Sequence, residues 1–242
     1  MTYKFRPLAD AAAPREAPSP ALRTLSARLA FRLRRHELPA LRGALVAHAG
    51  RDLDLLHNHL PGKQNYHYRY PLIQYRLDHG QAALFCIGEG SQAIRKVLQA
   101  PAATLDLNGR RVDLTVDEVS IDFHHPQVVE GFRAYELLHY LPLNQQHERT
   151  FRQLDQYARG GYLARLLTSH LLAFASGINW HVPERIVVDL DAVRQLPSVN
   201  YKGVNRYAFH VRFRCNLVLP EGIGLGKAVA MGYGVVKARR AS

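Results

Sequence analysis

The feature that most constrains the fold is an alternation of apolar and polar residues that begins at Leu25. Over residues 25–34, leucine, alanine and phenylalanine alternate with serine, arginine and alanine, and this period of two predicts a half-buried β-strand. Residues 37–47 then carry Leu and Val at the spacing of one helix face. The first folded part of the chain is therefore expected to open with a strand and a helix.

The same pattern continues through the first half of the chain. Residues 66–77 and 82–87 predict two strands, because Asp78-His79-Gly80 between them is typical of a hairpin turn. Residues 88–99 predict a short helix, and residues 113–123 predict one more strand. The order strand, helix, strand, strand, helix, strand is the split βαβ pattern of a ferredoxin-like domain.

The second half repeats parts of this pattern. Residues 132–140, 185–190 and 201–219 predict strands, and residues 148–176 predict a long helix. We expect Gly160-Gly161 to break or bend that helix, because glycine is a poor helix former. The apolar stripe that predicts the helix consists of Leu154, Tyr157, Leu163, Leu167, Leu171 and Phe174.

Two domains of the α+β class follow from this order. We expect residues 22–130 to form an N-terminal ferredoxin-like domain, and residues 131–242 to form a C-terminal one that ends in a glycine-rich loop. Residues 1–21 are rich in Ala and Pro and show no periodicity. We therefore expect a mobile tail there.

The charge balance indicates a polyanionic partner. Lys and Arg total 32 against 20 Asp and Glu, a formal net charge of +12, and 26 of the 32 cations are arginine. Arginine favours phosphate, because its planar guanidinium can bind two phosphate oxygens at once.

No apolar run approaches the roughly 18 residues that a membrane span needs, and two cysteines, Cys86 and Cys215, are too few for a disulfide framework. We expect a cytoplasmic nucleic-acid-binding protein with no membrane partner.

A first candidate site is His57-Asn58-His59, with Tyr66 close behind it. Two imidazoles can act as general base and general acid without a metal. Such a pair suits RNA cleavage, in which a ribose 2′-hydroxyl loses its proton and attacks the adjacent phosphorus while the departing 5′ oxygen gains one. The spacing by itself leaves chance proximity open. Zinc is disfavoured, because no Cys or carboxylate cluster near the histidines completes a ligand set, and we expect neither a metal nor another cofactor.

A second candidate site is the glycine-rich stretch after Pro220. Glycines let backbone N–H groups approach an anion closely, and Lys227 adds a positive charge. A Walker A loop is excluded, because Glu221 and Ala228 stand where that motif has glycine and serine or threonine. A phosphate-contacting loop and a tight turn between strands both stay open. The residues concerned are Gly222, Gly224, Gly226, Lys227, Gly232 and Gly234.

A third feature interleaves basic and aromatic residues on predicted strands. Residues 66–70 alternate Tyr with His and Arg, and residues 201–214 mix Tyr and Phe with four Lys and Arg side chains. Exposed aromatic rings stack on unpaired bases while arginine holds the RNA backbone, although the same alternation fits a core face opposite a solvated one. The candidate RNA-binding cations are Lys202, Arg206, Arg212 and Arg214.

These pieces together resemble the CRISPR-associated repeat-RNA endoribonucleases, the sixth Cas family, and within it the b-type branch. The resemblance covers about residues 22–238. In the first half it is carried by His57-Asn58-His59, by residues 68–75 (Tyr-Arg-Tyr-Pro-Leu-Ile-Gln-Tyr) and by Gly88-Glu89-Gly90. In the second half it is carried by Leu143-Asn144-Gln145, Leu172-Ala173-Phe174-Ala175, Tyr201-Lys202-Gly203, residues 216–220 and the glycine-rich loop, which is similar to the family's signature loop.

The resemblance implies two tandem ferredoxin-like (RRM-like, RAMP-type) domains and metal-independent cleavage within the CRISPR repeat. It implies that His57, His59 and Tyr66 form the active site, with His59 as the more critical acid–base residue. His57 would be its counterpart, and Tyr66 would orient or stabilise the scissile phosphate. The implied products are a 2′,3′-cyclic phosphate and a 5′-hydroxyl, with the mature guide RNA retained. One departure is Ala228, where the family commonly has Ser after the lysine.

The partners implied are the CRISPR repeat RNA, the guide RNA cut from it and other Cas subunits of a type I effector complex, and a homodimer is left open. The runner-up interpretation is a non-cleaving guide-RNA-binding subunit of an interference or transposon-associated complex. Such a subunit would keep the fold and the basic surfaces while the histidines do no chemistry. The presence of His57, His59 and Tyr66 together favours the endoribonuclease.

Overall fold

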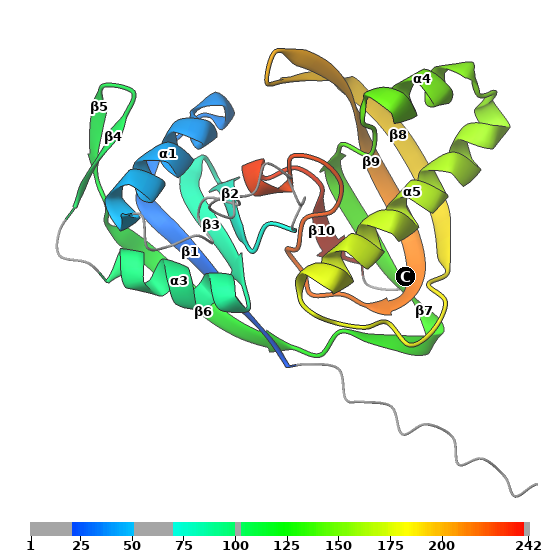
Figure 1. Cartoon of the computed structure of the whole chain (residues 1–242), viewed down its shortest axis with the longest axis horizontal. Coiled ribbons are helices and arrows are strands. Elements are labelled where there is room, and N and C mark those ends of the chain that lie inside the picture. Colours follow the sequence, from blue (N-terminus) through cyan, green and yellow to red (C-terminus); the bar gives the residue numbers. More distant parts are fainter. Residues whose placement is uncertain (1–20, 51–69, 100–102, 240–242) are drawn as a thin grey trace, which may run out of the picture.

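The computed structural model describes residues 21–50, 70–99 and 103–239. Within these residues the chain forms two four-stranded antiparallel sheets, one in each half, and helices cover one face of each sheet (Figure 1). The α+β class and the tandem arrangement of two ferredoxin-like domains are thereby confirmed.

The N-terminal sheet has the strand order β2-β3-β1-β6. The predicted hairpin joins β2 and β3 at His79-Gly80, where both residues have positive φ (46° and 82°), as two-residue turns matched to strand twist require. Helices α1 and α3 pack on one face of the sheet (Figure 1). The elements are β1 (Leu22–Arg32), α1 (Leu38–Ala49), β2 (Ile73–Asp78), β3 (Gln81–Ile87), α3 (Glu89–Leu98) and β6 (Val116–His124).

The alternation in β1 sorts its side chains as the sequence predicts. Leu25 and Leu29 are buried in one cluster with Leu41 of α1 and Ile94 of α3. Arg28 points to the opposite face and is partly exposed. Burying a leucine or isoleucine side chain contributes about 1.5–3 kcal/mol to the stability of the fold. The apolar face of β1 therefore stabilises the packing of both α1 and α3 on the sheet.

The sequence pattern does not predict β4 and β5 in the first half, nor β10 (Val235–Ala238) in the second. Between α3 and β6 the chain forms a small hairpin of β4 (Thr104–Leu107) and β5 (Arg110–Asp113), with Asn108-Gly109 as its turn. Each strand has four residues, too few for a period of two to stand out. The start predicted for the next strand, residue 113, is wrong, because Asp113 ends β5 and β6 begins at Val116.

The C-terminal sheet has the order β10-β7-β9-β8, and helices α4 and α5 cover one of its faces (Figure 1). Between β9 and β10, where the ferredoxin pattern has its second helix, the chain forms the glycine-rich loop with one 3-10 turn, η2 (Val229–Met231). The elements are β7 (Gln127–Tyr140), α4 (Gln145–Gln153), α5 (Gln156–Gly177), β8 (Val188–Tyr201), β9 (Val204–Val218) and β10 (Val235–Ala238).

The helix predicted over residues 148–176 is two helices, and the expected break at Gly160-Gly161 is wrong. The break lies at Leu154, whose backbone is extended, and Asp155 begins α5 by accepting a backbone hydrogen bond at 2.8 Å. The two glycines lie inside α5, where each costs only about 1 kcal/mol relative to alanine. Tyr157 does not belong to the apolar stripe, because it lies in the first turn after the break and is 94% exposed.

The strand expected over residues 201–219 begins later than predicted. β8 runs on to Tyr201, and Lys202-Gly203 form a tight turn with positive φ (52° and 76°) before β9 starts at Val204. Within β9, Val211 and Phe213 are buried and alternate with exposed arginines, as predicted.

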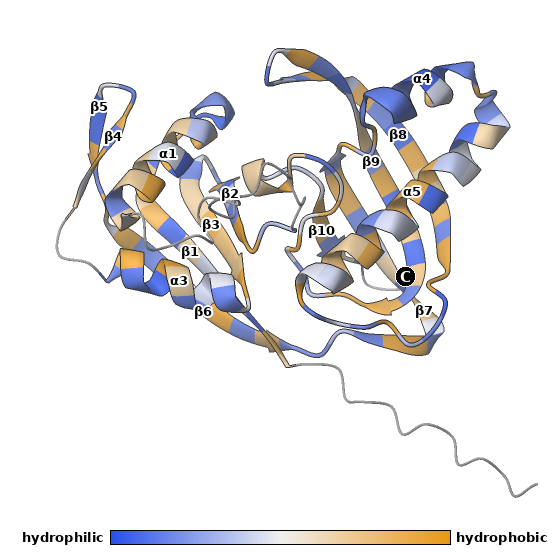
Figure 2. Ribbon diagram, viewed as in Figure 1, coloured by the Kyte–Doolittle hydropathy of each residue, from blue (hydrophilic) through white to orange (hydrophobic). Residues whose placement is uncertain are grey.

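The two halves share their apolar core. One cluster of buried side chains joins Phe85 of β3 to Leu137 of β7 and Ile223 of the glycine-rich loop. A second cluster joins Leu84 to Tyr233. Figure 2 shows apolar and polar residues alternating along strands of both sheets. In the described part of the chain, each sheet therefore has one face covered by helices and a second face without them (Figure 1). No helix among the described residues is long and apolar enough to cross a membrane.

Candidate functional site

The predicted catalytic residues His57, His59 and Tyr66 lie outside the described residues, and their arrangement stays a prediction. The described chain resumes at Tyr70. The Tyr70 hydroxyl donates a hydrogen bond to the Gly224 carbonyl at 2.8 Å. The chain just before β2 is thus tied directly to the glycine-rich loop of the other half.

Tyr70 is held from three sides. Its ring meets the Phe174 ring of α5 edge-on, with 5.3 Å between centroids, and its hydroxyl accepts a hydrogen bond from Gln74 Nε2 at 3.0 Å. Burial raises the pKa of Tyr70. The phenol therefore stays protonated and acts here as a structural link between the halves.

The glycine-rich loop folds back on β10 and on the end of β7. The Leu225 N–H donates to the Gly234 carbonyl at 2.8 Å, and the Gly234 N–H donates to the His139 carbonyl at 3.1 Å. The Lys227 N–H donates to the Leu141 carbonyl at 2.9 Å. Buried backbone donors need such partners. These three N–H groups bind carbonyls of the chain itself, which favours the tight-turn interpretation for this part of the loop.

Close packing accounts for the glycines. A Cβ on Gly226 would lie 2.7 Å from the Tyr140 ring, and a Cβ on Gly224 would lie 2.5 Å from a valine methyl. A Cβ on Gly234 would overlap a backbone carbonyl, and the φ of Gly234 is +66°, in the left-handed region that favours glycine. The same crowding applies to Gly222 and Gly232.

The Lys227 side chain belongs to a half-buried cluster of basic groups. The Tyr140 hydroxyl and His170 Nδ1 are hydrogen-bonded at 2.7 Å. Burial lowers the pKa of His170 to about 4, and the charges of Lys227 and His147 act in the same direction. Burial and the charge of Arg206 lower the pKa of Lys227. At pH 7 His170 is neutral, and the positive charge beside the loop comes from Lys227 and Arg206.

The predicted RNA-binding cations Lys202 and Arg206 lie towards the free end of the β8–β9 hairpin. Arg206 pairs with Glu148 of α4 at 3.4 Å, and Glu148 is only 9% exposed. Lys202 occupies the exposed turn itself, with its Nζ 5.9 Å from the centre of the Tyr201 ring. Lys202 is therefore open to a ligand, whereas Arg206 also neutralises a buried carboxylate.

Arg212 and Arg214 project from β9 on the face of the sheet that carries no helix. Arg212 Nε lies 3.3 Å from a carboxylate oxygen of Glu136, and Arg214 Nε lies 2.8 Å from one of Asp191. The two arginine side chains remain 56% and 48% exposed. Both guanidinium groups face solvent, but each shares its charge with an acidic neighbour.

A cleft of about 510 Å³ lies between the open face of the N-terminal sheet and strands β7 and β10. The sequence pattern does not predict this cleft, because alternation shows which face of a strand is polar but not which faces meet. The ionisable side chains that line it are Arg28, Arg35, Arg76, Asp78, Glu118, His139 and Lys237.

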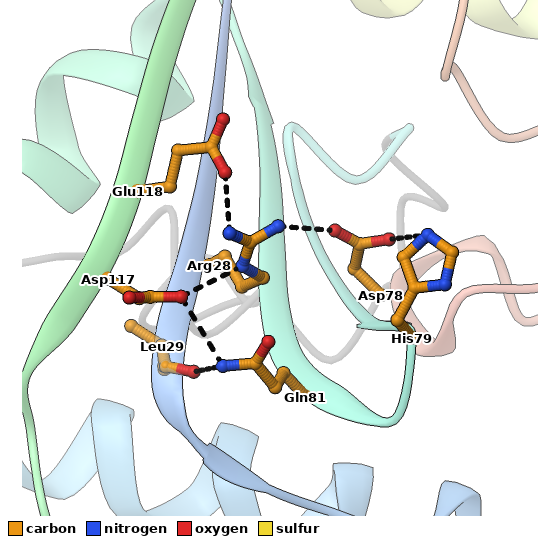
Figure 3. A network of polar contacts seen from close by, with 7 residues as sticks. All are labelled: Arg28, Leu29, Asp78, His79, Gln81, Asp117 and Glu118. Atoms are coloured by element: carbon orange, nitrogen blue, oxygen red, sulfur yellow. Dashed lines mark hydrogen bonds and ion pairs between the residues drawn. The ribbon is translucent and has the colours of Figure 1, made fainter.

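On the sheet side of this cleft, Arg28 ties three elements together (Figure 3). Its guanidinium contacts carboxylate oxygens of Asp117 at 3.1 Å, Glu118 at 2.7 Å and Asp78 at 3.5 Å. The hydrogen bond to Asp117 raises the pKa of Arg28. Gln81 completes the network by donating to Asp117 at 3.4 Å. Because three carboxylates surround one cation, this side of the cleft is unsuited to phosphate.

Arg76 is a half-buried cation of the same cleft. Its guanidinium carbon lies 4.4 Å from the centre of the Phe85 ring. One of its guanidinium N–H groups donates a hydrogen bond to the side-chain oxygen of Gln74. Its Nε is buried and has no hydrogen-bond partner among the described residues. Burial lowers the pKa of Arg76 to about 10. Arg76 therefore stays charged at pH 7 and is a candidate anion contact that the sequence pattern does not single out.

Among the described residues, no group of three or more His, Cys, Asp and Glu side chains could hold a metal ion. The free cysteines Cys86 and Cys215 are both buried, and burial raises the pKa of each thiol. In the described part of the molecule, these two thiols therefore stay protonated and buried, and a ligand would contact basic side chains and backbone groups instead.

Two family models divide this chain between them. The Cas6b N-terminal domain matches residues 21–125, and the Cas6b C-terminal domain matches residues 127–239. Together they span both sheets and the glycine-rich loop. The chain belongs to the Cas6b family.

Solved structures agree with the fold of this Cas6b chain. A crystal structure of Cas6b has a TM-score of 0.77 at 22% identity, covering 90% of this chain and 100% of that one. The crystal structure of a CRISPR RNA processing endoribonuclease Cas6b has a TM-score of 0.68 at 20% identity, with the same coverage. An uncharacterized protein of Methanocaldococcus jannaschii is 23% identical over 133 residues, which are 54% of this Cas6b chain and 90% of that protein.

Proposed function

We propose that this Cas6b chain is the endoribonuclease that cuts CRISPR precursor RNA within its repeats. The observation that carries the proposal is the match of both Cas6b domain models in a chain that also holds His57, His59 and Tyr66. A similar solved protein is named a CRISPR RNA processing endoribonuclease. The net charge of +12 supports a nucleic acid as the ligand.

In the proposed reaction one of His57 and His59 takes the proton of the ribose 2′-hydroxyl at the cut. The 2′ oxygen attacks the adjacent phosphorus and the bond to the 5′ oxygen breaks, while the other histidine protonates the departing oxygen. The products are a 2′,3′-cyclic phosphate and a 5′-hydroxyl, and the scheme needs no metal. We assign the more critical proton transfer to His59, and the orientation or stabilisation of the scissile phosphate to Tyr66.

We propose that the product stays bound through contacts that substrate and product share. Lys227, Lys202 and Arg206 supply positive charge on one side of the C-terminal domain, and Arg212 and Arg214 supply it on the open face. Contacts of this kind do not speed product release. A guide RNA held in this way is the link through which other Cas subunits of a type I effector complex would join.

The test is cleavage of the cognate repeat RNA in EDTA, comparing the wild type with His59→Ala, His57→Ala and the control His79→Ala. His79 is suited to this control because its side chain is 92% exposed. We expect loss of about 10²–10⁴ in rate for the catalytic variants and no change for the control. A substrate with a 2′-deoxy nucleotide at the cut should bind and remain intact, and mass spectrometry should find the cyclic phosphate.

Two outcomes contradict the proposal. Tight binding of a verified cognate repeat without cleavage would assign the chain to the non-cleaving guide-RNA-binding subunits instead. Cleavage of the 2′-deoxy substrate, or loss of activity in EDTA with recovery in a divalent metal, would overturn the acid–base mechanism.

A further inference from the structure

The two four-stranded sheets have four edge strands, β2, β6, β8 and β10. The outer edge of β10 is covered by the glycine-rich loop, through a bridge between Gly224 and Val235. The edge strand β2 packs against η2, and a Cβ added to Gly232, next to η2, would lie 3.0 Å from the Tyr75 carbonyl oxygen of β2. The edge strand β8 contains Pro197, which interrupts the row of backbone N–H groups at that position. The edge strand β6 carries three exposed large apolar side chains.

One side of β6 pairs with β1, and among the described residues nothing pairs with the other. Val119, Ile121 and Phe123 alternate along β6 and register with residues of β1 on the helix-covered face. They are nevertheless 49%, 47% and 69% exposed. Figure 1 shows β6 along the outer margin of the N-terminal half, and Figure 2 shows its apolar and polar residues alternating. An exposed apolar stripe beside free backbone groups is a site for strand addition.

The polar side of β6 is acidic in a chain that is otherwise strongly basic. Three of its nine residues are Asp117, Glu118 and Asp122. Arg28 pairs with the first two, whose side chains remain 44% and 61% exposed. This charge repels RNA phosphate and attracts cations. A second copy of β6 would bring further carboxylates to the same edge, and like charges opposite one another destabilise strand pairs.

We propose that the free edge of β6 binds an extended segment of a partner protein in which apolar residues alternate with Lys or Arg. The segment adds a fifth strand to the N-terminal sheet. Its apolar side chains cover Val119, Ile121 and Phe123, and its cations face Glu118 and Asp122. This docking site goes beyond RNA cleavage and does not depend on it.

The probe is a synthetic peptide of about ten residues, one strand in length, that alternates Lys and Val. It is titrated into the full-length chain, with binding followed by fluorescence anisotropy and hydrogen exchange of the β6 amides. We expect saturable binding that weakens with salt, and protection confined to β6. A peptide with the same residues in two blocks, and one that alternates Glu and Val, should not bind.

Variants of the chain sharpen the test. Ile121→Lys should weaken peptide binding by roughly tenfold or more, whereas Leu172→Lys should not, although Leu172 on α5 is as exposed as Ile121 (49% against 47%). Asp122→Lys should weaken the Lys peptide and allow the Glu peptide to bind. Circular dichroism confirms that each variant folds. Repeat-RNA cleavage is measured in parallel and should be unchanged, which separates failure of docking from failure of the proposed function.

Three results overturn the proposal. The first is a complete lack of β6 protection by the Lys peptide. The second is a dimer in light scattering that Ile121→Lys abolishes, which would assign the edge to a second copy. The third is protection of β6 in the free chain that is lost when residues 1–20 are deleted, which would assign the edge to the chain's own N-terminal segment.

Discussion

Five glycines of the loop between β9 and β10 stand where a Cβ would come within 3.0 Å of another part of the chain. Side chains are excluded there by neighbours such as the Tyr140 ring and the Phe85 ring, which belong to different halves of the molecule. At the scale of the residue, therefore, packing between the halves is sufficient to require glycine. Any contact of the loop with RNA must use the groups that this packing leaves open.

The variant Gly234→Ala is expected to destabilise the fold by about 2–4 kcal/mol, because the new Cβ overlaps a carbonyl at a positive φ. The matched control is Gly160→Ala in α5, where nothing lies within 4 Å of the added Cβ. That substitution should stabilise the chain by about 0.5–1 kcal/mol. Urea unfolding of both variants checks the difference, and equal effects would contradict the packing argument.

His170 is expected to make stability depend on pH. Its folded pKa is about 4, below the ordinary value of 6.5, so the unfolded state binds the proton more tightly. Stability therefore falls as pH drops below about 6.5 and stops falling below about pH 4. At pH 5 the loss amounts to about 2 kcal/mol.

The measurement for His170 is urea unfolding at pH 7.5 and pH 5. The variant His170→Gln should lose about 2 kcal/mol less than the wild type between these two values. His79→Gln serves as the control, because the His79 side chain is 92% exposed. An identical pH dependence in the wild type and His170→Gln would show that His170 does not carry the effect.

At the scale of the element, short-range chemistry decides where helices and strands begin and end. Asn144 and Asp155 each accept a backbone hydrogen bond at the start of α4 and α5, as N-cap residues do. Lys202-Gly203 reverse the chain between β8 and β9. These signals lie within a few residues of the boundaries that they set.

The variant Asp155→Ala removes the cap of α5 and should cost about 1 kcal/mol. Asp155→Ser keeps an oxygen that can accept the same hydrogen bond, so it should retain most of the stability. Thermal and urea unfolding of the two variants give the comparison. If serine and alanine were equally destabilising, the capping interpretation of the break at Leu154 would be wrong.

At the scale of the whole molecule, two properties dominate: a core that both halves share and a net charge of +12. The charge is not uniform. Cations gather near the glycine-rich loop and on β9, while β6 is acidic. This separation gives the molecule one set of surfaces suited to RNA and one edge suited to protein.

Repeat-RNA affinity should therefore fall steeply with salt. If roughly six phosphates are contacted, the dissociation constant should rise by about three orders of magnitude between 50 and 200 mM salt. Lys202→Ala should reduce the slope of log affinity against log salt by about one. Arg111→Ala, an exposed arginine on β5 outside the predicted RNA-binding set, should leave the slope unchanged. Filter binding over this salt range is the measurement, and a flat response would contradict RNA binding through phosphates.

Local patterns of the sequence were enough to predict most of the strands, the α1 and α3 helices, the β2–β3 turn and the family, because each depends on residues close together in the chain. They failed at Leu154 and at the β4–β5 hairpin, where the signal was one cap or two very short strands. Of the candidate site, His57, His59 and Tyr66 rest on motif and resemblance, and they lie outside the described residues.

The sequence by itself determined most of the elements, their order and the excess of positive charge, since periodicity, turn chemistry and composition are local or additive. Only the tertiary structure decided that N–H groups of the glycine-rich loop bind the carbonyls of Gly234, His139 and Leu141, and that Arg76 lines a cleft between the halves. It also decided that β6 is left with an open edge. These features depend on which faces and edges meet, and that is set by packing between residues far apart in the chain.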